Sequence, residues 1–168
     1  MMVPGVVEIL LVEDNGDDAE LALHALRSSK LANRILVLED GETALDFLFC
    51  RGAFQDRSFV HPPRLVLLDL KLPKVDGLEV LKALKNDPRT KAIPVVVLTA
   101  SKQETDMVSG YQLGANSYIQ KPVDFDQFRE IVKQLGMYWL VVNQPPPENT
   151  FRQQKGVSSL AEETVPKI

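Results

Sequence analysis

The sequence predicts an α/β fold in which a central parallel sheet is covered by helices on both faces. Two observations carry this prediction. Short, continuous apolar runs recur along the chain, and segments with a helical spacing of apolar residues follow them, five times over. Continuous apolar runs indicate strands that are buried on both faces, as in a parallel sheet. We therefore expect a doubly wound, five-stranded parallel sheet flanked by five helices.

The strand candidates share short length and apolar composition; they are residues 6–12, 34–38, 65–68, 93–98 and 117–119. The first helix is expected over residues 17–29, because two aspartates open it and the helix dipole favours carboxylates there. Asp87–Pro88 ends the third helix. The remaining helical segments are residues 41–51, 78–84, 102–113 and 125–135.

The length of 168 residues corresponds to one domain with a short extension. We expect a globular domain over residues 6–143. Residues 144–168 contain three consecutive prolines and few large apolar side chains, so this tail is expected to be flexible or weakly docked.

Composition excludes several classes of protein. The net charge of -4 argues against nucleic-acid binding, which needs a basic face. The single cysteine, Cys50, cannot form an intramolecular disulfide and favours a reducing compartment. No apolar run approaches the roughly 20 residues that span a bilayer, and no secretory signal is evident at the start, so we expect a cytoplasmic protein without membrane contact.

Polar side chains mark the ends of four strand candidates. Glu13 and Asp14 follow the first, Asp69 follows the third, Thr99 ends the fourth and Lys121 follows the fifth. In a doubly wound sheet, ligands bind beyond the carboxyl ends of the strands. These side chains are therefore expected to converge on one site.

Three neighbouring carboxylates would repel one another, and a divalent cation removes that repulsion. Mg²⁺ suits the set, because it takes oxygen ligands and keeps several waters. One carboxylate is then able to act as a nucleophile and form an aspartyl-phosphate. Thr99 is suited to donate a hydrogen bond to a phosphoryl oxygen, and Lys121 to supply a compact positive charge.

Each residue also has a purely structural explanation. Asp14 or Asn15 would serve as a helix cap, and Asp69 as a turn residue. Thr99 would satisfy a strand end, and Lys121 would be a solvated surface lysine. The conjunction of these residue types on four strand ends favours a single functional site.

The same residues resemble the receiver domain of two-component response regulators, over about residues 6–140. The motifs that carry the resemblance are residues 11–15 (LVEDN), 67–73 (LLDLKLP), 76–77 (DG), 97–100 (VLTA) and 114–122 (GANSYIQKP). The resemblance implies a flavodoxin-like sheet with strand order 2-1-3-4-5. It also implies a protein that catalyses only its own phosphorylation and dephosphorylation and is not otherwise an enzyme.

The resemblance assigns roles to individual residues. Asp69 would be the phospho-acceptor, and Thr99 and Lys121 would hold the phosphoryl group. Asp14 would bind Mg²⁺ directly and Glu13 directly or through water, and Asp69 and the backbone carbonyl of Lys71 would complete the protein ligands. Thr99 and Tyr118 would form the conformational switch, and Lys121–Pro122 would be a cis peptide bond.

Some positions vary within the family. The acid pair is Glu-Asp here rather than Asp-Asp. Lys71 and Ser101 occupy positions that tune aspartyl-phosphate lifetime in the family, and their identities do not predict a half-life.

A narrower resemblance is to the stand-alone receivers that serve cyanobacterial and bacterial phytochrome histidine kinases. It rests on the long connection at residues 52–63, residues 86–90 (NDPRT) and the aromatic pair Tyr138–Trp139. The implied partners are a sensor histidine kinase, such as a bacterial phytochrome, and a downstream protein whose identity stays open. The apolar stretch of residues 137–142 favours a homodimer through the face of the fourth helix, fifth strand and fifth helix. Alternatively, this apolar stretch would be covered by the tail or would complete the core.

Other functions remain as alternatives. A phosphate-independent pseudo-receiver would keep the fold without the chemistry. A phosphohydrolase of the haloacid dehalogenase kind needs a second aspartate two residues after its nucleophile, where this chain has Lys71. A flavodoxin-like cofactor binder needs a phosphate-cradling loop after the first strand, and the acidic residues 13–18 would repel a phosphate.

Overall fold

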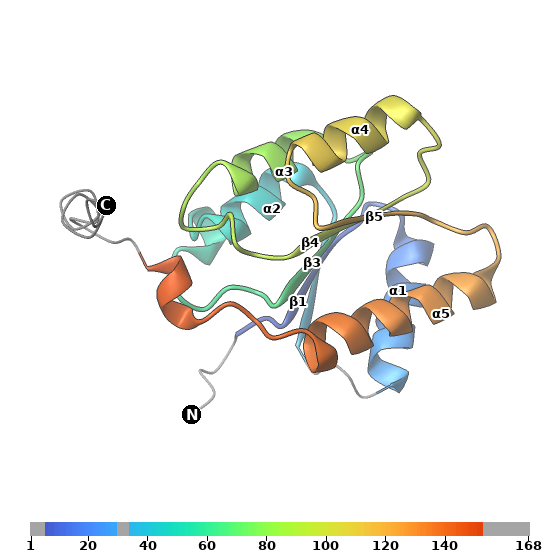
Figure 1. The fold of residues 1–168 in the computed structure, drawn as a ribbon, viewed down its shortest axis with the longest axis horizontal. Coiled ribbons are helices and arrows are strands. Elements are labelled where there is room, and N and C mark those ends of the chain that lie inside the picture. Colours follow the sequence, from blue (N-terminus) through green and yellow to red (C-terminus); the bar gives the residue numbers. More distant parts are fainter. Residues whose placement is uncertain (1–5, 30–33, 153–168) are drawn as a thin grey trace, which may run out of the picture.

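A computed structural model describes residues 6–29 and 34–152 of the chain (Figure 1). Five parallel strands form one sheet in the order β2-β1-β3-β4-β5, which confirms the expected fold class. The strands are β1 (Ile9–Val12), β2 (Ile35–Leu38), β3 (Leu65–Leu68), β4 (Val95–Thr99) and β5 (Ser117–Gln120).

Five α-helices cover the sheet, α1 and α5 on one face and α2, α3 and α4 on the other (Figure 1). They are α1 (Gly16–Ser28), α2 (Gly41–Leu48), α3 (Gly77–Lys85), α4 (Glu104–Gln112) and α5 (Phe125–Met137). Shorter turns are the 3₁₀-helices η1 (Gly52–Phe54) and η3 (Glu148–Phe151) and the π-helical turn η2 (Tyr138–Val142). Across the described ranges, none of the helices combines the length and the apolar character that crossing a membrane requires.

The core has two layers, because successive strand side chains point to opposite faces. Leu10 and Val12 pack with α2 and α3, whereas Ile9 and Leu11 pack with α1 and α5. Strands β1 and β3 run in step, with Val12 opposite Leu68. The residues that follow these two partners therefore emerge side by side.

Helix α2 ends earlier than the expected residue 51. Cys50 adopts a left-handed backbone with a φ of 53°, which no α-helix continues. The amide of Arg51 then donates to the carbonyl of Asp46, the bond that closes a Schellman-type helix end. Cys50 itself is half-buried.

The chain beyond α5 returns along the amino ends of the strands. Pro145, Pro146 and Phe151 lie beside the residues that precede β1, β3 and β4. Phe151 is only 3% exposed and belongs to the core layer of α2 and α3. The rest of the tail, residues 153–168, lies outside the described residues.

The peptide bond between Lys121 and Pro122 is trans, so the expectation of a cis bond there is wrong. The trans isomer of a prolyl bond is the lower in energy by about 0.5–1 kcal/mol. The amide of Lys121 donates to the carbonyl of Thr99, at 2.7 Å.

Candidate acidic site at the carboxyl edge of the sheet

The site begins where β1 and β3 end together. Glu13 and Asp69 follow the paired residues Val12 and Leu68, and the amide of Asp69 donates to the carbonyl of Val12 at 3.1 Å. Both side chains are buried, Glu13 at 4% and Asp69 at 8% exposure. Parallel register therefore brings two carboxylates together that lie far apart in the sequence.

Lys121 lies at the centre of the acidic residues. Its Nζ donates to Oδ2 of Asp69 and to Oδ2 of Asp18, both at 2.9 Å, and also contacts Oε1 of Glu13. The side chain is 7% exposed, so the sequence-based alternative of a solvated surface lysine is wrong. Three carboxylates thus surround one ammonium group.

The two oxygens of Asp69 have different environments. Oδ1 accepts hydrogen bonds from the amides of Leu70 at 2.7 Å and Lys71 at 3.4 Å. Oδ2 faces Lys121. The backbone orients the carboxylate through one oxygen and leaves the other for charge-based contacts.

The pKa values of Glu13 and Asp69 are shifted in opposite directions. Burial raises the pKa of Glu13 to about 7, against the lowering effect of Lys121. Burial also opposes ionisation of Asp69, but hydrogen bonds from Glu13 and Lys121 and the charge of Lys121 outweigh it and lower its pKa. Likewise, hydrogen bonds to the carboxylates outweigh burial and raise the pKa of Lys121.

Glu13, Asp14 and Asp69 could hold a metal ion together, because each offers a carboxylate oxygen within 4.8 Å of the others. Asp14 is exposed, and it is Asn15 whose side chain caps α1, by accepting from the amide of Asp18 at 3.0 Å. The donor set fits a hard divalent cation. The carboxylates of this set carry more negative charge than Lys121 alone neutralises, which favours binding of a divalent cation.

Thr99 and Tyr118 lie on the neighbouring strands. Thr99 is fully buried, and its Oγ1 accepts from the amide of Ser101 at 3.2 Å. The hydroxyl of Tyr118 is buried and has no hydrogen-bond partner within the described part of the chain. Its ring lies against Gly110 of α4, where a Cβ atom would come within 3.1 Å.

Sequence reasoning assigned no role in the site to three residues that contribute to it. Asp18 was expected only as a first-turn acid of a helix, yet it contacts Lys121. A Cβ atom on Gly77 would lie 2.2 Å from the carbonyl oxygen of Asp69, so this glycine lets α3 approach the acceptor loop. Asp106 of α4 is nearly buried and accepts from Ser101, and no sequence pattern signalled it.

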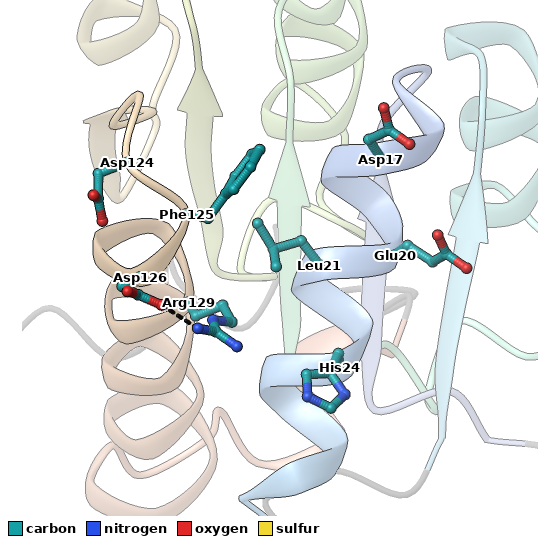
Figure 2. A pocket seen from close by; sticks show the side chains of 8 residues that line it. All are labelled: Asp17, Glu20, Leu21, His24, Asp124, Phe125, Asp126 and Arg129. Carbon is teal, nitrogen blue, oxygen red and sulfur yellow. Dashed lines mark hydrogen bonds and ion pairs between the residues drawn. The ribbon is translucent and has the colours of Figure 1, made fainter.

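A hollow of about 710 Å³ lies beside the site, between α1 and α5 (Figure 2). Phe125 and Leu21 project into the gap between the two helices, and Phe125 is 71% exposed. His24 of α1 also lines it. The full lining is Asp17, Glu20, Leu21, His24, Asp124, Phe125, Asp126 and Arg129.

A doubly wound sheet with clustered carboxylates, a buried lysine and a buried threonine at its carboxyl edge defines an α/β domain of the CheY-like class. The sequence pattern of the response regulator receiver domain matches residues 9–133. The chain belongs to this family, as its motifs indicated.

Two curated relatives cover most of the chain. The probable methanogenesis regulatory protein FilR2 of Methanothrix harundinacea is 45% identical over 138 residues, which is 82% of this chain and 86% of that protein. Response regulator Rcp1 of Synechocystis is 39% identical over 132 residues, 79% of this chain and 88% of Rcp1.

Solved structures of response regulators are also similar to this chain in sequence and fold. The Mn²⁺-bound form of Rcp1 superposes with a TM-score of 0.77 at 38% identity, covering 82% of this chain and 97% of that chain. The phosphorylated cyanobacterial phytochrome response regulator RcpA also gives a TM-score of 0.77, at 41% identity, with coverages of 82% and 96%. The chain thus resembles phytochrome-associated response regulators in sequence and in fold.

Proposed function

We propose that this chain is a single-domain response regulator that accepts a phosphoryl group from a histidine kinase on Asp69, with Mg²⁺. The observation that carries the proposal is the contact of Lys121 with Oδ2 of Asp69 beside the acidic cluster. A nucleophilic oxygen, a fixed cation and a set of metal ligands meet at one point. Phosphoryl transfer needs little beyond such positioning and charge neutralisation.

In the proposed reaction, Oδ2 of Asp69 attacks the phosphorus, an O–P bond forms and the bond from phosphorus to the donor breaks. The amides of Leu70 and Lys71 hold Oδ1 and so orient the nucleophile. Lys121 and the hydroxyl of Thr99 would bind phosphoryl oxygens. Glu13, Asp14, Asp69 and the carbonyl of Lys71 would hold Mg²⁺, which supplies the remaining charge neutralisation.

The experiment is intact mass spectrometry after incubation with acetyl phosphate and Mg²⁺. Wild type should gain one phosphoryl group, and Asp69→Asn should gain none. Asp126→Asn, an exposed carboxylate at the start of α5, is the matched control and should behave as wild type. A wild type that neither gains mass nor binds beryllofluoride would support the pseudo-receiver alternative instead.

A histidine kinase is the proposed donor, and a bacterial phytochrome kinase is the specific candidate, since RcpA is a phytochrome response regulator. The hollow between α1 and α5 offers a docking surface near Asp69, with Val123 and Phe125 exposed beside it. Phe125→Ser should slow transfer from a purified kinase about tenfold and leave transfer from acetyl phosphate unchanged. Equal slowing with both donors would exclude this docking surface.

A switch of protein contacts is the proposed output. Phosphorylation would draw Thr99 toward the phosphoryl group and shift Tyr118, whose hydroxyl already lies buried, and so change the face formed by α4, β5 and α5. This face carries two groups of exposed apolar residues, which suit a homodimer or a downstream protein. They are Met107, Val108 and Tyr111 on α4, and Met137, Tyr138, Val141 and Val142 beyond the core turns of α5.

A further inference from the structure

A polar cluster joins α4 to the loops that follow β3 and β4. Oδ2 of Asp106 accepts from Oγ of Ser101 at 2.6 Å and lies 3.6 Å from Nζ of Lys71. The Asp106 side chain is 12% exposed, whereas that of Lys71 is 65% exposed. One oxygen of a nearly buried carboxylate thus contacts both the hydroxyl of Ser101 and the exposed ammonium group of Lys71.

We propose that Asp106 is a positioning residue that holds Lys71 in the unphosphorylated protein, and that phosphorylation of Asp69 transfers the Lys71 ammonium from Asp106 to the phosphoryl group. This inference rests on the proposed function, because it needs Asp69 to be the acceptor. Through Lys71, Asp106 of α4 would be linked electrostatically to the phosphorylation site at Asp69.

The backbone places Lys71 within reach of both anions. Its amide donates to Oδ1 of Asp69 at 3.4 Å, so its side chain starts next to the acceptor. A lysine carries its charge on a flexible four-carbon stem. Lys71 is therefore able to exchange one anion for the other without movement of the main chain.

The charges favour the exchange. An ion pair with a mostly exposed lysine is weak, since water and salt screen it. A phosphoryl group on Asp69 carries about -1.5 to -2 charges at neutral pH in place of the single charge of the free carboxylate, and this is more than the single charge of Asp106. Once the phosphoryl group is present, it becomes the stronger partner for Lys71.

Asp106 stays in place when Lys71 leaves. Ser101 continues to donate to it, and the amide of Ser101 is in turn bonded to Oγ1 of Thr99. Hydrogen bonds thus run from β4 through Ser101 to α4. The departure of Lys71 leaves a nearly buried carboxylate on α4 without its cation, one residue before the exposed Met107. Phosphorylation would in this way leave a negative charge without its cation in the first turn of α4.

The test measures the affinity for beryllofluoride, a phosphoryl mimic, at constant Mg²⁺, by ¹⁹F NMR of the bound species. Asp106→Asn removes the charge but keeps an oxygen that accepts from Ser101. This variant should bind beryllofluoride about two- to fivefold more tightly than wild type, because Lys71 no longer has a competing anion. In a Lys71→Met background the same substitution should have no such effect.

Two further variants separate positioning from general charge effects. Glu104→Gln removes an exposed negative charge from the first turn of the same helix and should leave the affinity near the wild-type value. Asp106→Glu keeps the charge and should restore wild-type affinity. Lys71→Met alone should weaken binding, a result that stands even if Asp106→Asn does not fold.

Equal gains from Asp106→Asn with and without Lys71, or an equal gain from Glu104→Gln, would overturn the inference while leaving the proposed function intact. An unchanged affinity in Lys71→Met would also overturn it. A wild type that binds no beryllofluoride and takes no phosphate would overturn the proposed function, and this inference with it.

Discussion

Nζ of Lys121 lies 2.9 Å from Oδ2 of Asp69, although 52 residues separate the two along the chain. The same ammonium group contacts Glu13 and Asp18, so it provides the positive charge among the buried carboxylates. In this state Lys121 neutralises part of the charge that a divalent cation would otherwise neutralise. Lysine and metal ion are therefore expected to compete.

Lys121→Met should increase the affinity for Mg²⁺ by about tenfold, because a fixed positive charge beside the metal ligands is removed. The same variant should lose most phosphorylation by acetyl phosphate, because the phosphoryl oxygens then lose the ammonium group that Lys121 would supply. Calorimetric Mg²⁺ titration and intact mass measure the two effects. Lys102→Met, an exposed lysine, is the control; if it gave the same gain in affinity, the effect would be one of net charge.

Gly77→Ala should destabilise the protein by about 3 kcal/mol and reduce phosphorylation of Asp69. The added Cβ would meet backbone atoms, 2.2 Å from the carbonyl oxygen of Asp69 and 2.6 Å from Cα of Leu70, which cannot yield without moving the acceptor loop. Urea unfolding measures the loss. Gly16→Ala, with open space around its Cβ, is the matched control and should be neutral or slightly stabilising.

Val141→Glu should weaken self-association at least about tenfold if the α4-β5-α5 face forms a homodimer, because it buries an unpaired charge there. Val141 is 59% exposed, which makes it a cleaner probe than Trp139, whose side chain packs against the core. Sedimentation at micromolar concentrations measures the mass of the assembly. Val123→Glu, 94% exposed near the opposite end of α5, should leave it unchanged.

The opposite result for Val141→Glu is equally informative. An unchanged monomeric mass for wild type and variant, with and without beryllofluoride, would exclude the homodimer. The exposed residues of α4 and η2 would then remain available to a different protein.

Asp40→Ala should cost about 1 kcal/mol of stability at pH 7, because the Asp40 side chain caps α2 by accepting from the amide of Thr43 at 2.7 Å. Hydrogen bonds from Thr43 lower the pKa of Asp40 in the folded protein. The ionised Asp40 therefore stabilises the fold above pH 3.8, and this stabilisation is lost as the pH falls through the lowered pKa. The difference from wild type in urea unfolding should therefore shrink in strong acid. Asp40→Asn keeps the cap without the charge and should show no such loss.

Local patterns were sufficient to predict the sheet and the residues at its edge. Continuous apolar runs become parallel strands. The central strands β1, β3 and β4 are buried throughout, whereas the edge strands β2 and β5 are only partly buried. The residue after each run emerges at the carboxyl edge. Glu13, Asp14, Asp69, Thr99 and Lys121 were expected there for this reason, and the structure brings Glu13, Asp14 and Asp69 within 4.8 Å. Their chemical roles stay predictions until phosphorylation is measured.

Contacts that depend on side-chain direction between distant elements were decided only by the tertiary structure. Asp18 bonds to Lys121 across 103 residues, and Lys71, in the loop after β3, pairs with Asp106 of α4. The burial of Phe151 in the core layer of α2 and α3 belongs to the same group. Hydrophobic periodicity determines which residues are buried and on which edge a polar group emerges. It does not determine which charge each polar group meets, because that depends on helix packing and on the rotamers that the packed neighbours allow.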